Sequence, residues 1–273
     1  MLFLLKIAVT PLLVAGVALV ARRWGPTVGG ILMGLPWFTG PVLFILILDQ
    51  GIDFGIAACL GVMIAVTCIS AFMLAYGLVA AVAGWPLSLA AGAAASLAGA
   101  AALSDPALLR ILPAALPPLW AAAGLGAASL CVALALLPRP RGRVLPQVPP
   151  WWDIPARMVA AAALVAALVT GAEALGPRLA GVLASYPIIL TVTGTFTHYN
   201  SGRDAIWRVL RGLAASLFGF IAFFLVVGLA LPAAGAVGAY ALASLSGLAI
   251  TAALLAAHRA RQTGWGGAVR PRS

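Results

Sequence analysis

The chain has 273 residues, of which 64% are hydrophobic and only 8% are charged, whereas an ordinary soluble domain carries about 25% charged residues. A water-soluble fold of this composition would lack a polar surface, so the sequence predicts an integral membrane protein. Sixteen basic residues oppose six acidic ones, but they stand in short clusters between apolar runs and do not form the basic, aromatic-lined face of a nucleic-acid-binding module. We therefore expect the lipid bilayer, and no nucleic acid, as a partner.

The apolar runs predict an all-α, polytopic bundle of nine transmembrane helices. A bilayer core about 30 Å thick requires roughly 20 apolar residues per helix, and proline, glycine and charge clusters mark where each run stops. In the first run the arginines follow the apolar stretch, which favours a retained helix over a cleaved signal peptide. The expected spans are 2–21, 28–48, 54–82, 86–103, 115–137, 155–172, 180–199, 212–231 and 235–257.

The basic residues predict the orientation of the bundle, because cytoplasmic loops carry the excess of Lys and Arg. With nine alternating spans, every basic residue except Lys6, Arg110 and Arg178 falls on or towards one side. We expect the amino terminus outside and the carboxyl terminus in the cytoplasm, in a bacterial inner membrane. The organisation that follows is a first membrane repeat over 1–137, a cytoplasmic Pro- and Arg-rich linker over 138–153, a second membrane repeat over 154–258 and a basic cytoplasmic tail over 259–273.

The two halves contain matching segments at one constant offset. Residues 24–36 resemble residues 175–187, and the same offset pairs Gly51 and Asp53 with Gly202 and Asp204. Five predicted spans separate the start of one repeat from the start of the next, and an odd number turns the second unit upside down relative to the first. The sequence therefore predicts an inverted repeat (5 + 4 helices), as in many secondary transporters.

Prolines interrupt two of the predicted spans at related places. Pro36 and Pro41 stand in the second span, with Thr39 between them, and Pro187 stands in the seventh. Each proline lacks a backbone donor and disturbs the preceding turn, and the freed carbonyls can bind a cation or a substrate hydroxyl. The alternative is a packing kink whose carbonyls are satisfied by neighbouring helices.

The seventh span is also rich in hydroxyl groups for a lipid-facing helix. Thr191, Thr195 and His198 share one helical face, which we expect to point into the bundle. Two alternatives stay open, because threonine hydroxyls can bond their own helix and a histidine near the cytoplasmic end can be merely interfacial. The predicted substrate-binding residues are Pro36, Thr39, Tyr186, Pro187, Thr191, Thr195 and His198.

The acidic residues fall at predicted helix ends and not within the spans. For Asp53 and Asp204 we favour helix capping through backbone donors and the helix dipole over ion coupling. The three cysteines lack the spacing of a zinc site, and the common phosphate-loop and hydrolase motifs do not occur. We therefore expect no metal, no cofactor and no enzymatic activity.

One stretch resembles a known family. Ala180-Gly181-Val182-Leu183 through Pro187, followed by His198-Tyr199-Asn200-Ser201-Gly202 and Ala205, is similar to the core of the small GlpM-type bacterial inner-membrane proteins, which are about one such repeat long. The resemblance implies a duplicated relative in the inner membrane and a link to exopolysaccharide production, without naming a substrate.

Two functions remain open at this point. The first is a secondary transporter, or a flippase of a lipid-linked substrate, that works by alternating access on a small-molecule or lipid-linked solute. The second is a non-transporting inner-membrane accessory protein of an exopolysaccharide or lipid pathway, held to its partners by the Arg-rich linker. A membrane-embedded enzyme ranks third, because convergent acids are missing. A homo-oligomer is compatible with either function.

Overall fold

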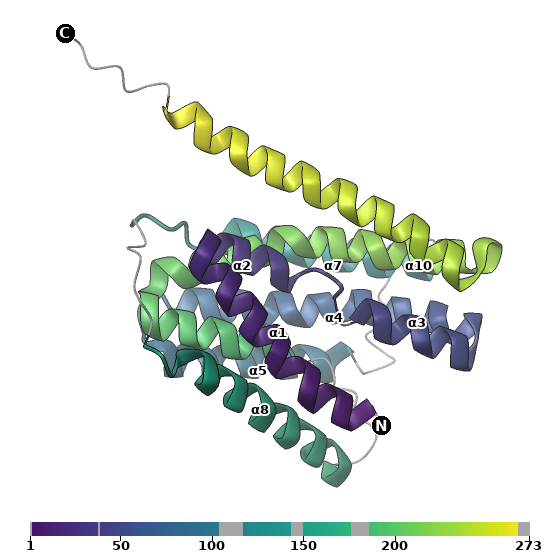
Figure 1. Cartoon of the computed structure of the whole chain (residues 1–273), viewed down its shortest axis with the longest axis horizontal. Coiled ribbons are helices and arrows are strands. Elements are labelled where there is room, and N and C mark those ends of the chain that lie inside the picture. Colours follow the sequence, from purple (N-terminus) through teal and green to yellow (C-terminus); the bar gives the residue numbers. More distant parts are fainter. Residues whose placement is uncertain (1, 38, 104–116, 143–149, 176–185, 267–273) are drawn as a thin grey trace.

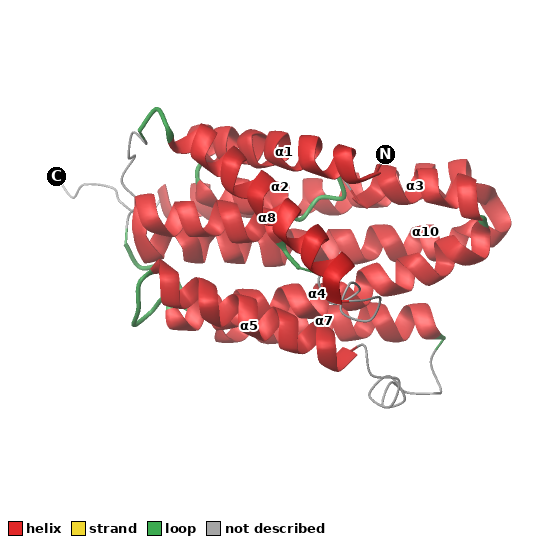
Figure 2. Ribbon diagram, turned by 90° about the horizontal axis from the view of Figure 1, so that it is seen from below, coloured by secondary structure: helices red, strands yellow, loops and turns green. Residues whose placement is uncertain are grey.

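The computed structural model describes residues 2–37, 39–103, 117–142, 150–175 and 186–266. These residues form eight helices that lie side by side in a bundle, and they contain no strand (Figures 1 and 2). The predicted all-α class is confirmed. The helices are α1 (Leu2–Trp24), α2 (Pro26–Met33), α3 (Thr39–Gln50), α4 (Ile52–Val79), α5 (Trp85–Leu103), α7 (Pro118–Leu136), α8 (Asp153–Leu175) and α10 (Ile188–Gly266).

Several helices are long and apolar enough to cross a bilayer. Within the described residues there are five such stretches: α4, α5, α7, the Asp153–Gly171 part of α8, and the Ile188–Gly247 part of α10. α3 is a shorter apolar helix. Because a bilayer core needs about 20 apolar residues per helix, these elements make the chain a multi-pass membrane protein.

The prediction of nine separate helices is wrong for the part of the chain that the structure describes. The second predicted span is two helices, since α2 ends at Met33 and α3 begins at Thr39. Pro36 stands in this break, where its missing N–H and its ring oppose helix continuation. The end of the seventh predicted span and the last two spans fall within α10, whose helical segments are separated by non-helical backbone at Gly202 and Gly235. Hydropathy does not distinguish such bent junctions from chain breaks.

Gly51 and Gly202, which the sequence pairs, adopt nearly the same backbone conformation. Gly51 has φ 91° and ψ 177°, and Gly202 has φ 78° and ψ −176°, a region open to glycine and costly for other residues. Each joins two helical segments. The inverted repeat itself stays a prediction, because residues 177–184, the counterpart of α2, lie outside the described residues.

Small residues bring α2 and α10 into close contact. Gly30 of α2 and Gly34, which directly follows α2, face Gly212 and Ser216 of α10. This four-residue spacing of small residues lets membrane helices approach closely. A Cβ atom added at Gly30 or Gly212 would collide with the backbone of the other helix. α2 is therefore fixed on α10, and the break at Pro36 is held in one place.

We expect Gly212→Ala to lower the free energy of unfolding by about 2 kcal/mol, because the added methyl group overpacks a backbone contact. The measurement is thermal unfolding in detergent. Gly61→Ala on α4 is the matched control, since no described atom lies within 4 Å of the added carbon, and it should be neutral or slightly stabilising. Equal midpoints for the two variants would refute the close contact.

One end of the bundle collects arginine side chains. There α1 ends, α8 begins and α10 bends at Gly202, and Arg22 of α1 pairs with Asp153 of α8. Arg208 of α10 donates to the carbonyl of Gly142 in the segment that follows α7. We call this end of the bundle the basic end.

Candidate functional site

The first segment of α10, residues 188–201, is polar and yet lies inside the bundle. Thr191, Thr193, Thr197 and His198 are only 1–8% exposed. A polar side chain removed from water loses free energy unless neighbouring groups supply hydrogen bonds. We therefore describe the hydrogen-bond partners of these buried side chains.

One face of the segment meets α4. The hydroxyl of Tyr76, a residue that is 1% exposed, lies 3.2 Å from Nδ1 of His198, and either group can donate, depending on the imidazole tautomer. The Thr195 hydroxyl lies beside that of Tyr76, and the Thr191 hydroxyl lies beside that of Tyr186, without the geometry of a hydrogen bond in either case. We call these five residues the hydroxyl face.

Phe72 of α4 connects the two tyrosines of the hydroxyl face. Its ring stacks on Tyr76 at 5.8 Å between centroids and meets Tyr186 edge-on at 6.2 Å. Phe72 is fully buried in the main apolar core. The tyrosine rings are thus fixed by packing, while their hydroxyl groups lie beside the polar side of α10.

Several threonine hydroxyls of α4 and α10 make no hydrogen bond of good geometry. The Oγ1 atoms of Thr67, Thr191, Thr193 and Thr195 are buried and unpartnered among the described residues. By contrast, Thr197 donates to the Thr193 carbonyl at 2.7 Å, so self-bonding within the helix accounts for Thr197 alone. Each unsatisfied buried group costs about 1–3 kcal/mol, so a cluster of them in one segment requires a structural or functional explanation.

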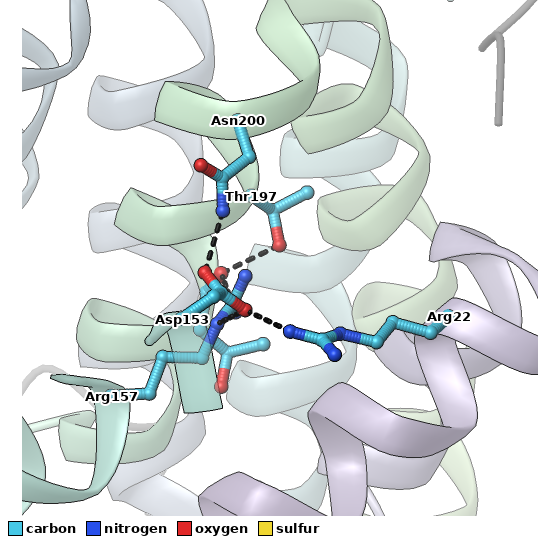
Figure 3. Close-up of polar contacts among 6 residues, drawn as sticks. Arg22, Asp153, Arg157, Thr197 and Asn200 are labelled. Carbon is cyan, nitrogen blue, oxygen red and sulfur yellow. Dashed lines mark hydrogen bonds and ion pairs between the residues drawn. The ribbon is translucent and has the colours of Figure 1, made fainter. Parts of the chain in front are cut away.

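The opposite face of the segment meets a buried charged cluster (Figure 3). Asp153, which is fully buried, accepts at Oδ2 from Arg22 at 2.7 Å and from Arg157 Nε at 2.9 Å. Its Oδ1 accepts from Asn200 Nδ2 at 2.6 Å. The charged cluster of Arg22, Asp153, Arg157 and Asn200 thereby connects α1, α8 and α10 at the basic end.

Arg157 links this cluster to the threonines. Its guanidinium donates to the Thr193 carbonyl at 3.3 Å and lies 5.1 Å from the centre of the Phe196 ring. Arg157 is 6% exposed, whereas the Arg22 side chain is 31% exposed and lies at the rim. Removing one partner of a buried ion pair destabilises a protein more than removing one partner of an exposed pair, because a buried charge is left unpaired. The Asp153–Arg157 pair is therefore the main contact that holds the cluster together.

The predicted site residues fall into two groups. Tyr186, Thr191, Thr195 and His198 lie together on the hydroxyl face, and Pro187 directly precedes α10. Pro36 and Thr39 lie instead at the break between α2 and α3, where the Pro36 carbonyl accepts from the Gly40 amide at 3.0 Å and Tyr240 donates to the Gly40 carbonyl at 2.9 Å. No hydrogen bond among the described residues joins the two groups.

Asp53 and Asp204, predicted to stabilise helix starts through backbone donors and the helix dipole, lie in different surroundings. Gly51, and no side chain, stands at the cap of α4, and Asp53 follows in the first turn. Asp204 Oδ1 accepts the backbone N–H groups of Arg141 and Gly142 at 2.7 and 3.1 Å. These two N–H groups lie outside any helix and donate to Asp204 instead of to a helical carbonyl. Asp204 thereby connects the segment after α7 to α10.

Comparison with known family models, curated proteins and solved structures gives no match. The resemblance to the GlpM-type proteins therefore stays a prediction. Within those residues, no three His, Cys, Asp or Glu side chains gather as metal ligands.

Sequence reasoning missed Tyr76 and the whole charged cluster. Arg157 was interpreted only as an orientation signal, and Asp153 only as a linker residue. Their spacing of four residues at the start of an apolar run was the available signal, since such a pair lies on one helical face. Tyr76 had no comparable signal, because it meets His198 only through the packing of α4 on α10.

Proposed function

We propose that the protein is a secondary transporter, or a flippase of a lipid-linked substrate, and that the hydroxyl face binds its solute. The observation that carries the proposal is the set of buried, unpartnered threonine hydroxyls on a membrane helix, beside the hydroxyl groups of Tyr76 and Tyr186. Polar groups inside a membrane bundle are expensive and commonly line substrate pathways. Hydroxyl and imidazole groups both donate and accept, which suits a polyhydroxylated or otherwise hydrogen-bonding solute.

Alternating access requires a contact that closes one side of the site and can break. The charged cluster meets this requirement, because a few hydrogen bonds at the basic end join three helices that otherwise belong to different parts of the chain. We propose that this end is closed when the cluster is formed and opens when α1 and α8 separate from α10. A solute that binds the two forms unequally would shift the balance between them.

The same proposal includes the inverted repeat and the orientation. The constant offset that pairs Gly51 and Asp53 with Gly202 and Asp204 supports the repeat, and the break at Pro36 supports a discontinuous helix of the kind found in such carriers. The arginines of the basic end support a cytoplasmic location for that end in a bacterial inner membrane, with the amino terminus outside.

The alternative is an accessory protein that binds partners without moving a solute. The observation in its favour is the segment after α7, which Asp204 and Arg208 hold against α10 as a fixed surface. Deleting residues 139–149 should abolish the phenotype of an accessory protein and leave a carrier largely active.

A ligand screen separates the two functions. Thermal unfolding of the purified protein is recorded against sugars, amino acids, organic acids, polyprenyl phosphates and cations, since a ligand that binds the folded state raises its stability in proportion to RT ln(1 + [L]/Kd). The carrier proposal predicts a saturable rise for one chemical class. A flat response across the whole panel, with a phenotype lost on deletion of residues 139–149, would favour the accessory protein.

A further inference from the structure

A second group of arginines at the basic end takes no part in the proposed solute site. These side chains come from the segment after α7 and from the part of α10 that follows Gly202. Arg203 donates to the Ala81 carbonyl at 3.3 Å, and Arg211 donates to the Leu134 and Leu137 carbonyls at 3.2 and 3.0 Å. We call this group the arginine patch: Arg139, Arg141, Arg203, Arg208 and Arg211.

The arginine patch is short of negative charge. Asp204 is its one acidic neighbour among the described residues, and one of its carboxylate oxygens already accepts two backbone N–H groups. Both ion pairs of the described chain involve Asp153 and not Asp204. Backbone carbonyls hold the guanidinium groups of Arg203, Arg208 and Arg211 in place. Asp204 is close enough to offset part of the charge of Arg203 and Arg208, and five arginines facing one acid leave the patch with a net positive charge.

One donor in the patch is already desolvated and unused. Arg208 donates to the Gly142 carbonyl at 2.7 Å, while its Nε–H is buried and has no partner among the described residues. Arg211 and Arg139 lie close enough for their charges to repel each other. Guanidinium groups with free N–H donors and a fixed geometry favour a phosphate, which accepts several charge-assisted hydrogen bonds at once.

The position of the patch indicates where that phosphate comes from. α4 ends beside Arg203 and α7 ends beside Arg211, so the patch stands where apolar helices leave the bilayer. Val82, next to Ala81, is 90% exposed, and the exposed rings of Trp85 and Tyr199 meet edge-on at 6.3 Å. Exposed aromatic and apolar side chains beside arginines are typical of the headgroup level of a membrane.

We infer that the arginine patch binds the headgroup phosphate of an anionic phospholipid. The lipid phosphate offers the missing negative charge at the right height in the bilayer, and its acyl chains lie against the neighbouring apolar helix surfaces. The inference is independent of transport, because it would hold equally for a carrier and for an accessory protein.

Lipid retention tests the inference. The full-length protein is reconstituted in vesicles of equal parts phosphatidylglycerol and phosphatidylcholine, extracted in mild detergent and washed, and the retained lipids are quantified by mass spectrometry. We expect phosphatidylglycerol to be enriched, and Arg139→Gln/Arg203→Gln to reduce the enrichment by roughly fivefold for each arginine removed. Both side chains are exposed, and the unfolding midpoint of the variant is measured alongside.

The control is Arg23→Gln, which removes one positive charge at the same end of the bundle from a side chain that lies over the Trp24 ring. It should retain as much phosphatidylglycerol as the unsubstituted protein. Equal retention of the two lipids, an equal loss in Arg23→Gln, or displacement of the lipid by inorganic phosphate alone would overturn the assignment. The last outcome would identify a soluble anion as the occupant.

Discussion

Asp153→Asn is expected to lower the free energy of unfolding by about 3–5 kcal/mol, because it leaves buried positive charge without a partner. The carboxylate is fully buried and accepts hydrogen bonds from Arg22, Arg157 and Asn200. An amide in its place can still accept, but it carries no charge and presents two donors to guanidinium groups that themselves only donate. Thermal unfolding in detergent measures the loss.

Three further variants show whether the loss comes from charge. Arg22→Gln should cost much less than Asp153→Asn, because the Arg22 side chain is partly exposed. Asp153→Leu/Arg157→Leu should recover much of the lost stability, since a buried ion pair replaced by apolar side chains is often neutral. Asp53→Asn, at an exposed position, should have little effect. A cost for Asp153→Asn no larger than that for Asp53→Asn would contradict the buried cluster.

Thr191→Val/Thr195→Val should separate stability from solute binding. Valine keeps the shape of threonine and removes a hydroxyl that makes no well-aligned hydrogen bond, so we expect the free energy of unfolding to stay within about 1 kcal/mol per site of the original value. The affinity for the solute found in the ligand screen should fall by about 100-fold, through the loss of two hydrogen bonds. Unfolding midpoints with and without the solute measure both effects.

Thr197→Val is the matched control for that variant. Thr197 lies on the same helix but donates to the Thr193 carbonyl, so its substitution should lower stability slightly and leave solute affinity unchanged. If the valine substitutions at Thr191, Thr195 and Thr197 changed stability and solute affinity by the same amounts, the hydroxyl face would have only a structural role.

Local patterns predicted the parts of this structure that depend on neighbours in the chain. Composition predicted an apolar helical bundle, Pro36 predicted a helix break, and helical spacing placed Thr191 and His198 on one inward face. Each follows from the chemistry of a short segment, with no knowledge of the other helices.

The parts that depend on contacts between distant segments were not predicted. Arg22, Asp153 and Asn200 belong to three helices, and only their packing brings them together. The nine-helix prediction failed for a related reason, because an apolar run does not show where one helical segment passes into the next, as it does at Gly202. Asp204 was interpreted as a cap, since its partners at positions 141 and 142 are far away in the sequence.

The accessibility of position 195 to water tests the central claim most directly, and it requires no known substrate. Thr195→Cys is introduced with Cys131, the exposed cysteine, replaced by alanine, while Cys59 and Cys68 are buried. In proteoliposomes, a charged, water-soluble thiol reagent should label this cysteine, because an alternating-access carrier exposes its solute site in turn to each side. Ala122→Cys, in the apolar core with no exposed surface, should stay unlabelled. Labelling of Thr195→Cys as slow as that of Ala122→Cys would contradict a water-accessible site on α10.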